Sequence, residues 1–195
     1  MRFAQYFYAE ANLPNIHGLA LFQADGLIGL YRPESVRNML LRRTEFSDEG
    51  VVAALQTRYN ARYDCQETEG VAAEHGFGPI IYLIGMQLSP NGLCPNRVRT
   101  QMNPEATRVW REFYDGKGSH MAEKEPLVSV DGELATHHED AFLNMKYFSN
   151  QPIDLSQARR LNEVILKNDP YDEKRIGLWE VIDAYLSNAL VAAGY

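Results

Sequence analysis

A glycine-containing segment, Gly76-Phe77-Gly78-Pro79, directly precedes the most apolar stretch of the sequence. The stretch from Pro79 to Leu88 is apolar on nearly every side of a helical projection, and a helix of that kind is buried. Glycines ahead of a helix let the backbone approach a ligand closely, and the first helical turn leaves N–H groups unpaired. The sequence therefore predicts a buried helix whose entrance suits a phosphate, although two glycines also occur in ordinary tight turns.

The composition limits the classes of partner that the chain can have. Its 195 residues carry a formal net charge of −7, which disfavours binding to the phosphate backbone of a nucleic acid. The longest apolar run, Pro79 to Met86, is too short to cross a bilayer, and the N-terminus shows no signal core. Cys65 and Cys94 do not form a C-x-x-C pair, which favours reduced thiols. We expect a soluble, cytoplasmic protein, or one carried inside an assembly, without a membrane or nucleic-acid partner.

Apolar periodicity and turn signals predict an α/β fold for the chain. Two apolar runs flank Ala24-Asp25-Gly26 and predict a hairpin from Gly18 to Tyr31. Pro33 favours the start of a short helix that ends near Arg43. Further strands are expected at 51–59, 62–68, 93–95 and 127–130, and further helices at 103–115, 154–165 and 171–193.

The C-terminal part of the chain carries an amphipathic pair of helices. Apolar residues recur at helical spacing in the second of them, including Leu178, Ile182 and Leu186. Such a face has to be covered, either by the chain's own sheet or by a partner protein or a second copy that binds through 171–195. We therefore divide the chain into a domain at 1–150 and a helical extension at 151–195.

Three sequence blocks in order resemble one known family. They are Gly76-Phe77-Gly78-Pro79-Ile80-Ile81-Tyr82, then Asn96-Arg97 with Ala106, Val109-Trp110 and Tyr114, and then Phe142-Leu143-Asn144-Met145-Lys146-Tyr147. The first block and the residues from Glu69 that precede it resemble the acyl-CoA-binding motif of the GNAT family of N-acetyltransferases. The set of three is most similar to the divergent GNAT-like proteins of tailed bacteriophages. This resemblance covers roughly residues 50 to 155.

The resemblance implies a mixed, mostly antiparallel sheet flanked by helices, whose strands splay at a V. It also implies acetyl-CoA or another acyl-CoA as co-substrate, with the pyrophosphate at the loop after the fourth strand. The pantetheine would lie along the strand that ends near Thr68, and the acyl group between that strand and Leu93-Cys94. The implied activity is transfer of the acyl group to an amine of a small molecule or protein. The loop residues that would hold the pyrophosphate are His75, Gly76, Phe77 and Gly78.

The sequence departs from the GNAT pattern at several positions. Ala73 stands where GNAT loops usually carry Gln or Arg, and Pro79 removes one N–H from the loop. Trp110 occupies the position of the tyrosine that protonates the CoA thiolate in many GNAT enzymes, which leaves Tyr114, one turn later, as the candidate general acid. Glu67, taken as an exposed acid at a strand end, is the candidate general base, with Glu69 as the alternative.

These departures leave other interpretations open. One is a GNAT-fold phage protein that has lost catalysis and acts as a virion component or as an inhibitor of a host system. A different small-molecule binder on the same scaffold is a further alternative. The location is then the cytoplasm of a bacterial host or the virion. No metal site is expected, because His137-His138-Glu139-Asp140 lacks the spacing that directs ligands to one point.

Overall fold

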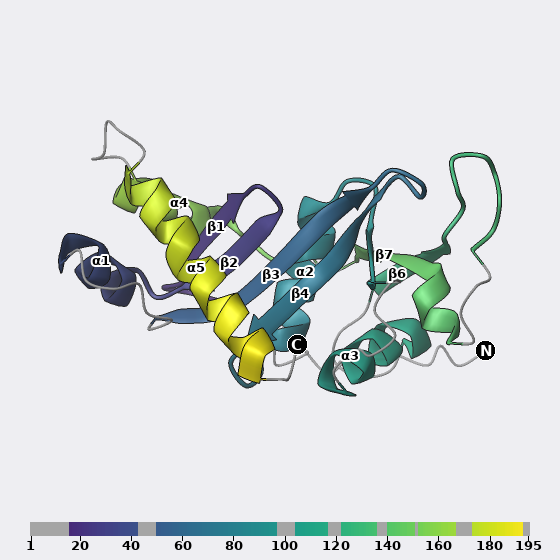
Figure 1. Ribbon diagram of the computed structural model, residues 1–195, viewed down its shortest axis with the longest axis horizontal. Helices are drawn as coiled ribbons and strands as arrows, with labels where there is room; N and C mark the ends of the chain where they lie inside the picture. The colour runs from purple at the N-terminus through teal and green to yellow at the C-terminus, as the bar shows by residue number, and fades with distance from the viewer. Residues whose placement is uncertain are drawn as a thin grey trace, which may run out of the picture.

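A computed structural model describes residues 16–42, 50–96, 104–116, 122–135, 140–150, 152–166 and 173–192. The described strands form one seven-stranded sheet in the order β1-β2-β3-β4-β5-β7-β6 (Figure 1). Neighbouring strands are antiparallel except β4 and β5, which are parallel. The predicted α/β class with a mixed, mostly antiparallel sheet is confirmed. The strands are β1 (Ala20–Ala24), β2 (Leu27–Tyr31), β3 (Val51–Asn60), β4 (Cys65–Ala73), β5 (Leu93–Cys94), β6 (Ala122–Pro126) and β7 (Met145–Ser149).

The predicted hairpin is formed by β1 and β2. Its turn residues Asp25 and Gly26 have φ values of 49° and 78°, the left-handed pair that a tight two-residue hairpin requires. A Cβ on Gly26 would lie 2.3 Å from the backbone oxygen of Thr57. Glycine at this turn therefore allows the hairpin to pack closely against β3.

Helices cover both faces of the sheet and one of its edges. The buried helix α2 and helix α3 lie on one face, and α1 and α5 lie on the other. Helix α4 runs beside β1 and contributes side chains to the cores on both faces (Figure 1), so that edge is not open to another strand. The helices are α1 (Pro33–Arg42), α2 (Gly78–Leu88), α3 (Pro104–Asp115), the 3₁₀ turn η1 (Ala141–Asn144), α4 (Ser156–Leu166) and α5 (Glu173–Ala192).

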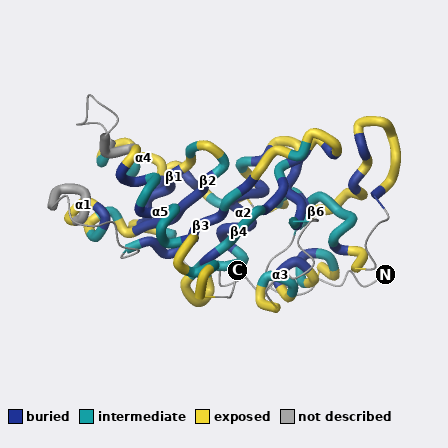
Figure 2. Tube along the Cα trace, in the orientation of Figure 1, coloured by how far each residue is buried: buried dark blue, intermediate teal, exposed yellow. Residues whose placement is uncertain are grey.

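Helix α5 packs its apolar face on the chain's own sheet. Leu178, Val181 and Ile182 are fully buried there, and the strands that this helix covers, β2 and β3, are mostly buried (Figure 2). Two strand glycines make room for the helix: a Cβ on Gly29 would lie 2.7 Å from Ile182 Cδ1, and one on Gly70 would lie 3.2 Å from Leu190 Cδ1. The close approach of α5 therefore depends on the absence of side chains from β2 and β4.

Two strand predictions need correction. The strand expected at 62–68 begins only at Cys65 and continues to Ala73, because residues 61–64 form the turn from β3. The strand expected at 127–130 is wrong, since this segment forms only an isolated bridge between Val128 and Leu134. The strands of that region are β6 and β7. Strand β6 is an exposed edge with the sequence Ala-Glu-Lys-Glu-Pro, and it lacks apolar alternation because a charged edge resists pairing with other chains.

Candidate functional site

Strands β4 and β5 pair over a short distance and then part. Their parallel register joins Gln66 to Leu93 and Glu67 to Cys94. One residue further, the Asn96 backbone N–H donates to Thr68 Oγ1 at 3.1 Å. Strand β4 continues to Ala73, and within the described ranges no strand pairs with Glu69–Ala73 on the β5 side. From Glu69 to Ala73, the backbone edge of β4 on the β5 side therefore has no partner among the described strands.

This edge offers backbone donors and acceptors to an extended ligand. The Glu74 N–H donates to the Val52 oxygen on β3 at 2.8 Å. Because hydrogen bonding alternates along an antiparallel ladder, the N–H and C=O of Ala73 point away from β3, toward the unpaired edge. Helix α5 covers one face of β4 at Gly70, and α2 lies on the opposite face. A ligand bearing amide groups can therefore pair with this edge as an added strand does.

A four-residue loop at 74–77 leads from β4 into α2. Gly76 has a φ of 88°, a conformation that costs other residues strain. The Phe77 N–H donates to the Glu74 oxygen at 3.0 Å, and the Ile81 N–H donates to the Phe77 oxygen at 3.0 Å. The loop is thus a closed turn that passes directly into the helix.

The N-terminus of α2 remains accessible. Phe77 caps the helix without a side-chain hydrogen bond, and Pro79 has no N–H to donate. The first-turn donors are therefore the N–H groups of Gly78 and Ile80, which have no partner within the helix. Apart from its chain neighbours and the backbone of the helix itself, no heavy atom of the described residues lies within 4 Å of a Cβ built on Gly78, and His75 is exposed. The four predicted loop residues 75–78 thus lie together at an open helix end.

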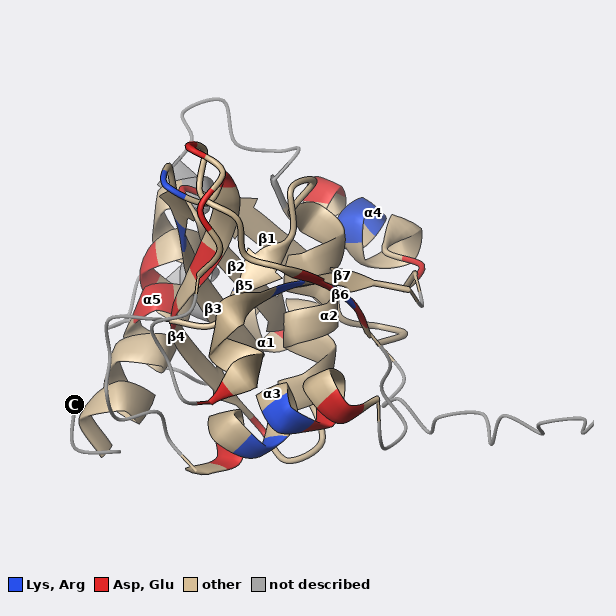
Figure 3. Ribbon diagram, turned by 90° about the vertical axis from the view of Figure 1, so that its right-hand side faces the viewer, with Lys and Arg blue, Asp and Glu red and all other residues tan. Residues whose placement is uncertain are grey.

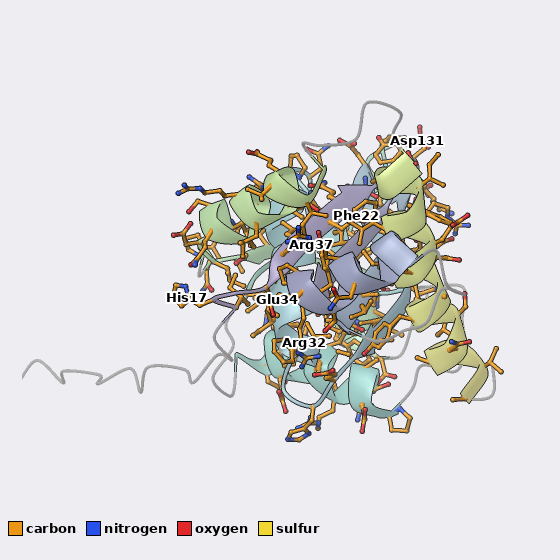
Figure 4. The ribbon with its side chains drawn as sticks, turned by 90° about the vertical axis from the view of Figure 1, so that its left-hand side faces the viewer. His17, Phe22, Arg32, Glu34, Arg37 and Asp131 are labelled. Carbon is orange, nitrogen blue, oxygen red and sulfur yellow. The ribbon has the colours of Figure 1, made fainter. Side chains whose placement is uncertain are left out.

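A charged pair stands at the start of this loop. The Arg32 guanidinium donates from Nη1 and Nη2 to the two carboxylate oxygens of Glu74 at 2.9 and 2.7 Å. This hydrogen bonding holds the pKa of the Glu74 carboxyl below its ordinary value. Arg32, labelled in Figure 4, directly follows β2. The pair therefore neutralises a carboxylate next to the loop and ties the loop to the end of β2.

Sequence reasoning did not identify Arg32 as a neighbour of the loop. A usable signal was present, because β2 and β4 are both antiparallel to β3 and so run in the same direction. Charged residues that directly follow two such strands therefore lie at the same end of the sheet, where both strands have their C-terminal ends. Arg32 and Glu74 occupy those positions, although 42 residues separate them.

Glu67 is not the exposed strand-end acid that the sequence indicated. It lies within β4, its exposed fraction is 2%, and the Asn60 Nδ2 donates to its Oε2 at 2.7 Å. Strand alternation places it on the same face as Cys65, whose sulfur lies 3.4 Å from that of Cys94. The error arose because β4 was expected to end near Thr68 and instead continues to Ala73.

The α3 aromatics lie on the opposite face of the sheet from Glu67. Trp110 is fully buried, with its ring centroid 4.8 Å from that of Tyr82 and 5.0 Å from that of Tyr147. Burial raises the pKa of the Tyr82 phenol above its ordinary range, and the neighbouring Trp110 opposes this only in part. Among the described residues, the Trp110 indole N–H reaches no acceptor at full hydrogen-bond geometry. Trp110 is therefore a core residue.

Tyr114 lies at the far side of this aromatic cluster. The Lys124 ammonium is 4.2 Å from the centroid of its ring and donates to its backbone oxygen. Lys124 belongs to β6, which is separated from β4 by β5 and β7. The structure therefore places Thr68 where β4 and β5 part and the loop residues beyond the C-terminal end of β4, but it does not bring Tyr114 and Glu67 together.

The described residues hold neither a metal-binding cluster nor a membrane-spanning helix. Across the described ranges, no group of three or more His, Cys, Asp or Glu residues is arranged to hold a metal ion. His137-His138-Glu139 and Arg97 lie outside those ranges. No helix in the part of the chain that the structure describes is both long and apolar enough to cross a membrane.

The chain was compared with protein-family models, with curated proteins and with solved structures, and none of them matches it. The GNAT resemblance therefore stays a prediction from the sequence blocks quoted above.

Proposed function

We propose that the chain is a GNAT-like N-acyltransferase, which transfers an acetyl or other acyl group from CoA to an amine. The observation that supports this most is the parting of β4 and β5 after Glu67 and Cys94. Strand β4, the fourth of the described strands, then continues to the glycine loop with β3 on one side and no described strand on the other. The family resemblance implies a V between two strands and a pyrophosphate at the loop after the fourth strand, and this arrangement suits both.

The residues of the chain suit the parts of an acyl-CoA in turn. The N–H groups of Gly78 and Ile80 would donate to pyrophosphate oxygens, supported by the N-terminal dipole of α2. The unpaired edge of β4 would pair with the pantetheine amides, which extends the proposed contact beyond Thr68 to Ala73. Acyl-CoA supplies a thioester carbonyl that the amine nitrogen attacks, so that a C–N bond forms and the C–S bond breaks.

The decisive experiment is calorimetric titration with acetyl-CoA of the parent protein and two variants at one position. Gly78→Asp places a carboxylate where the pyrophosphate would bind, whereas Gly78→Ala adds only a methyl group. Both substitutions fit, because no heavy atom of the described residues beyond the chain neighbours and the helix backbone lies within 4 Å of the added Cβ, and an acid in the first helical turn is favourable. We expect micromolar binding that Gly78→Asp weakens at least tenfold, which is about 1.4 kcal/mol, and that Gly78→Ala weakens less. Absence of parent binding at millimolar acetyl-CoA would overturn the proposal.

A second candidate is a GNAT-fold phage protein without catalysis, acting as a virion component or as an inhibitor of a host system. The observation that favours it is the separation of the two candidate catalytic groups, since Glu67 is buried on one face of the sheet and α3 with Tyr114 packs on the other. Thiol release from acetyl-CoA in the presence of a panel of amines distinguishes the two. Turnover that falls in Glu67→Gln or Tyr114→Phe supports the enzyme, while binding without turnover supports the second candidate.

A further inference from the structure

The segment from Leu127 to Ala135 is a small hairpin with two unlike faces. The Ala135 N–H donates to the Leu127 oxygen at 2.8 Å, and the Ser129 N–H donates to the Glu133 oxygen at 2.8 Å. Leu127 and Ala135 are buried in a cluster with Tyr63, Cys65 and Cys94. On the other side Val128, Val130 and Leu134 are 44%, 68% and 59% exposed. We call these three side chains the outer face of the hairpin.

An apolar outer face is unusual for a hairpin whose inner face is already buried. A strand pair with one buried face normally carries polar side chains on the other. The other exposed large apolar residues of the described chain are spread over β3, α4 and α5, whereas these three lie on a single turn of chain. Grouped apolar exposure of this kind marks a contact with another molecule more often than isolated exposed residues do.

Charges of both signs surround the outer face. The Val130 N–H donates to the Arg62 oxygen at 2.8 Å, so Arg62 lies beside the hairpin. The Arg62 guanidinium is 3.6 Å from Glu133, and both side chains are exposed. Asp131, labelled in Figure 4, occupies the exposed tip (acidic residues in red in Figure 3). A surface with both an acid and a base at its rim is complementary to its own copy when a two-fold axis relates the two.

The hairpin stands at one end of the part of the molecule that the structure describes. It projects from the body of the molecule at the end of the longest axis opposite α1 and α4 (Figure 1), and it is exposed along most of its length (Figure 2). Two molecules joined there extend away from each other. Two-fold dimers are also the commonest homo-oligomers.

We propose that the outer face of the 127–135 hairpin is the centre of a two-fold contact with the same face of a second copy of this chain. Val128, Val130 and Leu134 of the two copies pack together, and Arg62 of each copy pairs with Asp131 of the other. A second copy is the occupant that the patch favours, because a two-fold axis sets the base at the rim of one copy against the acid at the rim of the other. This inference does not depend on acyl-CoA binding.

The test is sedimentation equilibrium of the full chain at concentrations from about 1 μM to about 1 mM. Weak dimers associate within this concentration range. We expect a concentration-dependent dimer. Val130→Asp should raise the dimer dissociation constant at least tenfold, because it places two carboxylates in the apolar contact. Val164→Asp is the matched control: Val164 is 60% exposed, on α4 at the other end of the molecule, and its replacement should leave the constant unchanged.

A charge exchange tests the pairing at the rim. Arg62→Glu and Asp131→Arg should each weaken the dimer. Arg62→Glu also removes the ion pair with Glu133 of the same copy, so the double variant should bind more tightly than Arg62→Glu because it restores the contact between copies with reversed signs. Circular dichroism confirms that each variant is folded, and Leu134→Ser replaces Val130→Asp if the latter is not. A chain that is monomeric at every concentration overturns the proposal. Equal effects of Val130→Asp and Val164→Asp, or a double charge variant that binds no more tightly than Arg62→Glu, also overturn it.

Discussion

At the scale of residues, the Arg32–Glu74 pair shows how a single contact positions the candidate site. The two N–H···O bonds join the ends of β2 and β4 beside the glycine loop. The side chains are 48% and 41% exposed, so water and salt screen their attraction, and the pair contributes at most about 1 kcal/mol to stability. Its main effect is to hold Glu74, the residue from which the loop departs, in one orientation.

Arg32→Met should raise the pKa of the Glu74 carboxyl toward that of an isolated glutamate. The folded pKa is held below the unfolded one, so the pair stabilises the fold above the unfolded pKa of about 4.3. That contribution is lost as the pH falls through the folded pKa. The variant should therefore unfold more easily than the parent at pH 7, by up to about 1 kcal/mol, and equally easily in acid below both pKa values.

Carboxyl NMR titration and urea unfolding at the two pH values measure these effects. Arg37→Met, which removes an exposed charge from α1, is the control and should leave the Glu74 titration unchanged. An unaltered Glu74 pKa in Arg32→Met would show that the bidentate contact does not persist in solution.

At the scale of elements, helix α5 is the one for which the structure adds most to the sequence-based prediction. Its apolar residues fill the face of the sheet opposite α2, and Ile182 meets the backbone of β2 at Gly29. A helix that fits so closely against strand glycines contributes to the core of the fold. The surfaces of α5 left for other contacts carry the exposed residues Ile176 and Val191.

Ile182→Ala should lower the free energy of unfolding by about 2 to 5 kcal/mol, because it removes buried methyl and methylene groups and leaves a cavity against β2. Val191→Ala, on an exposed position of the same helix, is the matched control and should change it by less than about 0.5 kcal/mol. Denaturant titration followed by circular dichroism gives both values. A loss below about 1 kcal/mol for Ile182→Ala would mean that α5 is not seated on the sheet.

The elements that the sequence predicted correctly are those whose signals are local. The hairpin turn Asp25-Gly26 and the largely apolar helix α2 can each be recognised from a few adjacent residues. Strand β6 does not, because its identity depends on pairing with β7 and not on burial of its own side chains. The end of β4 was misplaced for a related reason, since Glu69–Ala73 is held by β3 on one side only.

The candidate site likewise combines residues with local sequence signals and residues whose neighbours depend on the order of the sheet. The loop at 75–78 could be predicted because its glycines and the following helix are adjacent in sequence. The relation between Glu67 and Tyr114 could not, since it depends on which sheet face each occupies, and a shift of one residue in β4 reverses that face. Arg32 depends on the common direction of two strands, which requires the order of the sheet.

At the scale of the whole molecule, the sheet separates two large apolar clusters, and each of them has a tryptophan in it or beside it. Trp110 lies in the cluster on the α2 face, and Trp179 lies on α5 beside the cluster on the opposite face. Strands β3 and β4 pair with each other over most of their length and contribute side chains to both clusters. Loss of either core therefore exposes strands on which the other depends.

This sharing predicts that α5 unfolds together with the rest of the chain. The Trp179→Phe variant retains only Trp110, whose fluorescence reports unfolding on the α2 face of the sheet. The Trp110→Phe variant retains only Trp179, whose fluorescence reports the unfolding of α5. Each variant has its own stability, so the fluorescence midpoint in urea is compared with the circular dichroism midpoint of the same variant. We expect the two midpoints to coincide in both variants, as a two-state transition requires. Loss of the Trp179 signal at lower urea than the dichroism would instead make residues 151–195 a separately folding extension of the sheet domain.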